Sequence, residues 1–104
     1  MTKNRLALSD AAVVDIVEQA DWYSTQSGKS LAQRWEDAVT STIMRTLHRP
    51  NTGTRCHFQA GELHDLRRTA VSGFPKHLLF YRFDRGVVLI LRVVHGARDL
   101  EGLL

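Results

Sequence analysis

The last third of the chain carries a set of basic side chains that could bind anionic groups. The set comprises Arg67, Arg68, Lys76, Arg82, Arg92 and Arg98. Guanidinium groups suit this chemistry because their planar fork binds a carboxylate or a phosphate through two hydrogen bonds. Arg82 and Arg92 each interrupt an apolar run, which is costly for a buried residue without a partner. We therefore predict a positive groove on the open face of a sheet. The alternative is a set of internal ion pairs with Asp65, Asp84, Asp99 or Glu101, beside ordinary solvated faces.

The segment from His95 to Asp99 offers a second kind of chemistry. The imidazole of His95 could act as a general acid or base near neutral pH, and Arg98 could stabilise charge on a phosphate. The segment also suits a structural role, in which Gly96 permits a chain reversal and Arg98 with Asp99 anchors the tail. We favour the structural interpretation and expect no catalytic residues. If the chain were a nuclease, its candidate residues would be Arg67, Arg82, His95 and Arg98.

Metal and thiol chemistry are not expected. His57, His64 and His77 lack the tight spacing of metal ligands, and no second cysteine joins Cys56 in a zinc site. A single cysteine excludes an internal disulfide and suits a reducing compartment. As a nucleophile it would also need a placed base. We therefore expect neither a metal nor a cofactor.

Composition predicts one domain that spans residues 1–104, because 43% of the residues are hydrophobic and 24% are charged. No apolar run approaches the roughly 20 residues that span a bilayer, and the N-terminus does not resemble a signal peptide. We therefore predict a cytoplasmic protein with no membrane partner. The net charge of +3 is uneven: residues 1–48 carry five basic and six acidic side chains, whereas residues 49–104 carry nine and five. The basic half should attract an anionic partner.

Two helices are predicted after a short first strand. Lys3–Leu8 alternates as a strand does, and Ser9 can cap a helix that runs to about Gln26. The apolar stripe of this helix comprises Val13, Ile16, Val17, Ala20 and Tyr23 or Ser24. Gly28 ends it, and Ser30 can cap a second helix. The second apolar stripe comprises Trp35, Ala38, Val39, Thr42, Ile43 and Leu47. The short break between the two predicts an antiparallel hairpin.

Three further strands are predicted after the hairpin. Thr52–Gly61 has no clear period and is predicted to be a loop. Leu63–Val71, His77–Phe83 and Val87–Val94 are predicted strands, and the last is apolar enough to be central. Asp84-Arg85-Gly86 is typical of a tight turn. The order β-α-α-β-β-β predicts an α+β fold, an antiparallel sheet with the N-terminal helical hairpin packed on one face.

Trp22 and Trp35 lie on or beside the predicted helix stripes. They either belong to the core or line a partly exposed apolar groove that a partner helix fills. We include both among the candidate partner-binding residues, together with the basic set.

Several short motifs follow one another in a fixed order. Residues 73–82 end in an aromatic–Tyr–Arg run, and residues 91–100 end a hydrophobic strand with His-Gly-Ala-Arg-Asp. The helix opening at 9–12, the segment 20–23 and the Arg-Pro-Asn-Thr-Gly turn at 49–53 complete the set. Together they resemble the ParE toxins, a branch of the ParE/RelE superfamily of type II toxin–antitoxin systems. The resemblance covers nearly the whole chain and implies the same β-α-α-β-β-β order.

What the resemblance implies is a toxin that inhibits DNA gyrase by binding it. It also implies a role in plasmid stabilisation and neutralisation by a ParD-like antitoxin. The C-terminal segment of such an antitoxin would lay apolar residues on the helical hairpin and acidic residues on the basic sheet face. Operator DNA would be bound only indirectly, through the antitoxin.

Two alternatives stay open. A RelE-like protein would be a ribosome-dependent mRNA endonuclease, which needs a base, an acid and a charge stabiliser. The chain departs from that pattern, because it has only three lysines and no tyrosine after Tyr81. A degenerate, non-toxic member would only bind its antitoxin.

Overall fold

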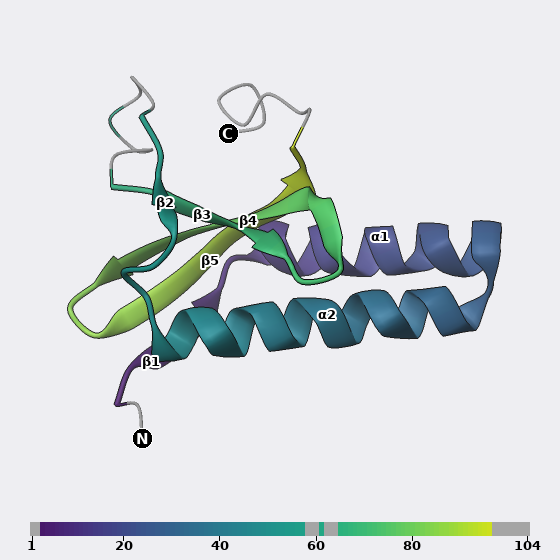
Figure 1. Ribbon diagram of the computed structural model, residues 1–104, viewed down its shortest axis with the longest axis horizontal. Coiled ribbons are helices and arrows are strands. Elements are labelled where there is room, and N and C mark those ends of the chain that lie inside the picture. Colours follow the sequence, from purple (N-terminus) through teal and green to yellow (C-terminus); the bar gives the residue numbers. More distant parts are fainter. Residues whose placement is uncertain (1–2, 58–60, 62–64, 97–104) are drawn as a thin grey trace.

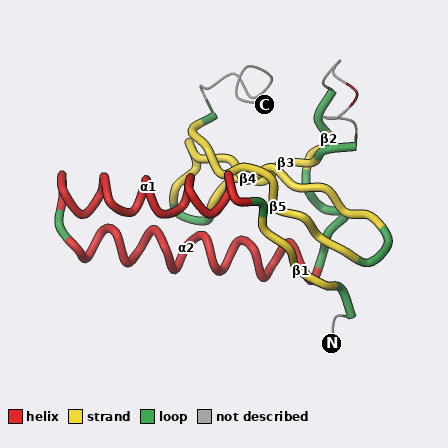
Figure 2. Tube along the Cα trace, turned by 180° about the vertical axis from the view of Figure 1, so that it is seen from behind, coloured by secondary structure: helices red, strands yellow, loops and turns green. Residues whose placement is uncertain are grey.

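The computed structural model places a helical hairpin against one face of a five-stranded sheet (Figure 1). It describes residues 3–57, 61 and 65–96. The helices are Asp10–Ser27 (α1) and Lys29–His48 (α2). The strands are Arg5–Leu8 (β1), Thr54–Arg55 (β2), Arg67–Val71 (β3), Phe74–Asp84 (β4) and Val87–His95 (β5). Seen from behind, the two helices again run side by side beneath the strands (Figure 2). The predicted α+β class, with the hairpin on one face, is confirmed.

The strands lie in the order β1-β5-β4-β3-β2, so the apolar strand β5 is internal as predicted. β5, β4, β3 and β2 pair in antiparallel fashion, but β1 pairs with β5 in parallel, from Arg5 opposite Val87 to Leu8 opposite Ile90. The sheet is therefore mixed and not wholly antiparallel. Parallel neighbours need a long crossover, which the helices and the other strands between β1 and β5 supply.

Several predicted boundaries were wrong. Thr54–Arg55 forms a short strand inside the predicted loop, and β4 begins at Phe74, three residues before the predicted start. β3 begins at Arg67, whereas the first residues of the predicted strand, 63 and 64, lie outside the described residues. α2 begins directly after Gly28, so Ser30 is not its cap. Gly28 has a φ of 93°, which lets the chain reverse between the helices within one residue.

The predicted inner face of α1 was only partly right. Ala12 and Ala20 are buried, whereas Val13 and Val17 are 46% and 52% exposed. Small side chains let the helix approach β5 closely, and this rotation turns Asp15 toward β5 in place of the valines. Ser9 caps α1 as predicted: its Oγ accepts a hydrogen bond from the Ala12 amide at 3.0 Å.

The main core lies between the hairpin and the sheet. Trp35 is fully buried there, and its Nε1 donates to the carbonyl of Ile16 at 3.1 Å. Its ring meets Phe74 edge to face, with centroids 5.2 Å apart. A smaller apolar cluster, formed by Leu66, Phe80 and Val94, lies on the opposite face of the sheet. Neither helix within the described ranges is long and apolar enough to cross a membrane.

The turn after α2 is tied to the sheet by Tyr81. Its hydroxyl donates to the Pro50 carbonyl at 2.7 Å and accepts from the Gly53 amide at 3.0 Å. A Cβ on Gly53 would lie only 2.8 Å from Cε1 of the Tyr81 ring, so only glycine allows this approach. Burial raises the pKa of the Tyr81 phenol, which therefore keeps its proton at neutral pH.

Replacing Tyr81 by phenylalanine should lower the free energy of unfolding by about 1–3 kcal/mol, because the Pro50 carbonyl and the Gly53 amide lose a buried partner. Urea unfolding would show a lower midpoint with an unchanged slope. Tyr23→Phe is the matched control, since the contacts described for Tyr23 involve its ring. Equal losses in the two variants would contradict the anchoring role of the Tyr81 hydroxyl.

Candidate functional site

An open groove of about 800 Å³ lies between α1 and the adjacent ends of β4 and β5. α1 contributes Glu18 and Trp22 to one wall, and the strands contribute Lys76, His77 and His95 to the other. The groove follows from the fold, because α1 crosses the sheet near the point where β4 begins and β5 ends. A groove of this size with polar and aromatic side chains in its walls is the candidate binding site.

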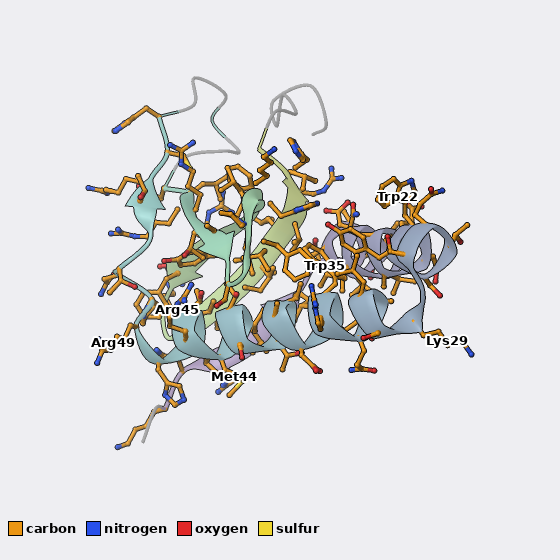
Figure 3. The ribbon with its side chains drawn as sticks, turned by 45° about the vertical axis from the view of Figure 1, so that its right-hand side comes forward. Trp22, Lys29, Trp35, Met44, Arg45 and Arg49 are labelled. Carbon is orange, nitrogen blue, oxygen red and sulfur yellow. The ribbon has the colours of Figure 1, made fainter. Side chains whose placement is uncertain are left out.

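Of the two tryptophans predicted to bind a partner, only Trp22 lies on the surface. Trp22 is 57% exposed and stands edge to face with Tyr23, with ring centroids 5.6 Å apart. Trp35 is fully buried between the helices and the sheet, so it offers no surface to a partner in this structure (Figure 3). Trp35 belongs to the predicted apolar stripe of the second helix, which agrees with its burial, whereas Trp22 stands next to the stripe of the first.

Arg92 was predicted to line an open positive groove, but it is held inside the protein. Its Nε and Nη2 donate to the two carboxylate oxygens of Asp15, each at 2.8 Å. Both side chains are only 12% exposed. The hydrogen bonds that Arg92 donates to Asp15 raise the pKa of the guanidinium, although burial opposes this effect. An internal ion pair was the predicted alternative, but Asp15 was not among the predicted partners.

The same carboxylate also satisfies the backbone edge of β5. The last pair between β1 and β5 joins Leu8 to Ile90, so beyond Ile90 the edge of β5 that faces away from β4 has no neighbouring strand. Ser9 supplies the next hydrogen bonds to this edge. Its amide donates to the Ile90 carbonyl at 2.9 Å, and its hydroxyl donates to the Leu91 carbonyl at 2.7 Å. Six residues after Ser9, Asp15 accepts a hydrogen bond from the Val93 amide at 2.9 Å. Asp15 is the residue that the sequence interpretation missed, because no local pattern indicates a partner 77 residues away.

The remaining basic residues differ in exposure and in their partners. The guanidinium of Arg67 donates to the carbonyls of Asn51 and Gly53, at 3.1 and 2.9 Å, and so supports the turn after α2. Arg68 and Lys76 are exposed and Arg82 is half-buried. Lys76 precedes Arg82 by six residues on β4, roughly 20 Å of strand. Arg98 lies outside the described residues.

The candidate nuclease residues are likewise separated. His95 lies opposite His77 in the β4–β5 ladder, whereas Arg82 lies opposite Leu89. Five residues of β4 therefore separate the two positions, roughly 17 Å at the rise of a strand. Among the described candidates, the potential base and the potential charge stabilisers do not face a common point.

His77 and His95 form a pair at the end of the groove. Their ring centroids are 5.5 Å apart, and His77 also stacks edge to face on Trp35 at 4.8 Å. His77 is 8% exposed, and burial followed by the nearby His95 lowers its pKa. Across the described positions, no three histidine, cysteine or acidic side chains converge on a possible metal site.

Cys56 does not have the character of a nucleophile. It is half-buried beside the smaller apolar cluster. Burial raises the pKa of its thiol, and this outweighs the opposite effect of Arg68. The thiol is therefore protonated at neutral pH, whereas a nucleophilic cysteine needs a thiolate.

Comparison with known proteins identifies a family. The sequence profile described as "ParE toxin of type II toxin-antitoxin system, parDE" matches residues 6–100. No curated protein sequence matches the chain.

Solved structures share the fold at low sequence identity. The chromosomal ParDE toxin–antitoxin system from P. aeruginosa superposes with a TM-score of 0.73 and 15% identity, over 88% of this chain and 95% of that one. A chain of the intact E. coli RelBE toxin–antitoxin complex gives 0.56 and 13%, over 91% and 99%. The isolated E. coli RelE toxin gives 0.55 and 13%, over 97% and 99%. At these identities the structures support the fold alone.

Replacing Asp15 by asparagine should lower the free energy of unfolding by about 2–3 kcal/mol, because it leaves the largely buried Arg92 charge without its counter-ion. The double variant Asp15→Asn/Arg92→Met should recover part of the loss. Arg55→Ala, which breaks an exposed pair with Asp65, is the control and should cost less than about 1 kcal/mol. An Asp15 variant no less stable than this control would contradict the assigned role.

Stability should fall as the pH falls below about 6.5, the ordinary pKa of histidine. The folded protein binds the His77 proton more weakly than the unfolded chain does, so acidification favours unfolding until the lower folded pKa is passed. Urea midpoints between about pH 7.5 and pH 5.5 measure the slope. His77→Gln should reduce the slope, whereas the exposed His57→Gln should leave it unchanged. An unaltered slope in His77→Gln would refute this contribution.

Proposed function

This chain belongs to the family of ParE toxins of type II toxin–antitoxin systems, and on that premise we propose that it inhibits DNA gyrase by binding. A ParD-like antitoxin neutralises it in the cytoplasm. Inhibition by binding requires an exposed surface that complements the target. It does not require a set of ionisable groups that converge on one reacting atom.

The separation of the nuclease candidates carries this proposal. Cleavage of RNA by its own 2′-hydroxyl needs a base and a charge stabiliser at one phosphate. Here roughly 17 Å of strand separates the position of His95 from that of Arg82. Arg67 is engaged with the turn carbonyls. Arg98, the fourth candidate, lies outside the described residues. The positions of the three described candidates support the gyrase inhibitor over a RelE-like endonuclease.

The antitoxin would bind two kinds of surface. Its apolar residues would enter the groove beside the exposed ring of Trp22. Its acidic residues would meet the exposed Arg68 and Lys76 on the strands. A segment that folds as it binds can cover both surfaces, because a disordered chain wraps a large area. The antitoxin would also supply the contact with operator DNA.

Induced expression of the chain alone in bacteria should arrest growth, and co-expression of the adjacent antitoxin gene should relieve the arrest. Incorporation of labelled thymidine and methionine separates the mechanisms. Gyrase inhibition predicts that DNA synthesis falls first while protein synthesis continues. An immediate stop in protein synthesis would instead indicate mRNA cleavage, and normal growth would indicate a non-toxic member.

Trp22→Ala tests the antitoxin contact separately. The side chain is 57% exposed, so the variant should fold as the wild type does. Its antitoxin complex should be at least about tenfold weaker, as expected for an aromatic anchor in an interface. Titration calorimetry measures this, with the exposed Met44→Ala on α2 as the control. Equal affinities in the two variants would remove Trp22 from the interface.

A further inference from the structure

The outer face of α1 is acidic in a protein whose net charge is +3. The helix holds four acidic residues and no lysine or arginine. Asp15 is neutralised by Arg92, whereas Asp10, Glu18 and Asp21 are exposed. α1 therefore leaves three acidic side chains on the surface without a basic residue on the same helix.

The same face is also apolar. Val13, Val14 and Val17 are 46%, 49% and 52% exposed, although valine is usually buried. Asp10, Val14, Val17 and Asp21 are spaced at four, three and four residues, which places them in one line along the helix. We call these four residues, with Val13 and Glu18 beside them, the outer stripe. It is a ridge of valines bounded by carboxylates at both ends and on one flank.

The dimensions of the outer stripe suit a helix. From Asp10 to Asp21 the helix rises by roughly 16 Å, about three turns. Half-exposed valines along such a line provide an apolar contact for a helix of similar length. The carboxylates then require cations in the partner, because an acidic segment would meet like charges.

We propose that the outer stripe binds an amphipathic helical segment of another protein, in which lysine or arginine flanks an apolar stripe. A second copy of this chain fits the stripe poorly: a symmetric contact through α1 would set Asp10 and Asp21 against the same acidic residues. The outer stripe borders the groove beside Trp22: Glu18, on its flank, also lines that groove, whereas Asp10, Val13, Val14, Val17 and Asp21 do not. This inference does not depend on gyrase as the target.

Two synthetic helical peptides test the charge rule. Both carry the same leucine stripe, flanked by lysine in one and by glutamate in the other, and each bears a fluorescent label. Fluorescence anisotropy with the full-length protein should show binding of the lysine peptide at least about tenfold tighter than that of the glutamate peptide. The preference should shrink at about 0.5 M salt. Equal binding, or preference for the glutamate peptide, would overturn the proposal.

Variants then locate the contact. Asp10→Asn/Asp21→Asn, which leaves the groove lining unchanged, and Val14→Ala/Val17→Ala should each weaken binding of the lysine peptide by about tenfold or more. Both pairs change exposed positions, and alanine favours a helix, so circular dichroism should show intact folds. Asp37→Asn on α2 is the matched control, because the exposed Asp37 accepts from Gln33 and asparagine keeps an acceptor oxygen.

Full binding in both stripe variants would place the peptide elsewhere and refute the inference. Sedimentation of the protein alone provides a second readout. A self-associated species that dissociates in Val14→Ala/Val17→Ala would show that a second copy occupies the outer stripe, and it would also refute the inference.

Discussion

The architecture depends on which groups form hydrogen bonds with the backbone of β5 beyond the end of β1. Backbone amides at a largely buried edge need partners, and β1 stops at Leu8. Ser9 and Asp15 supply those partners from the chain that continues into α1. Asp15 also binds the guanidinium of Arg92. A single carboxylate on α1 therefore connects the helix to the backbone edge of β5 and neutralises the Arg92 charge. Because this contact sets where α1 lies against β5, it also sets the groove and determines which face of α1 reaches solvent.

Two of the strand arginines have partners inside the protein and do not add to a binding surface. Arg92 is engaged with Asp15, and Arg67 with two turn carbonyls. Both side chains stabilise connections between helices and strands. The surfaces left for partners are the groove with its exposed Trp22, the separate cations Arg68 and Lys76, and the outer stripe. Such a distribution suits a protein that acts by contact with other macromolecules.

The order of elements could be predicted because local sequence patterns indicate it: the Ser9 cap, Gly28 between the helices, and the turn before β5. The rotation of α1 could not be predicted: the apolar stripe placed Val13 and Val17 beside Ala20, whereas Ala12 is the residue buried with Ala20. The Asp15–Arg92 pair and the parallel pairing of β1 join distant segments. The two-residue strand β2 exists only through its pairing with β3, so no periodicity can reveal it.

We propose that this toxin acts by binding gyrase and not by cutting RNA. Purified protein added to a gyrase supercoiling reaction, beside a parallel reaction with ribosome-bound mRNA, tests it most directly. Binding predicts lost supercoiling or accumulated gyrase-cleaved DNA, with the mRNA intact. Cleaved mRNA with undiminished supercoiling would contradict the claim and assign the chain to the nuclease branch.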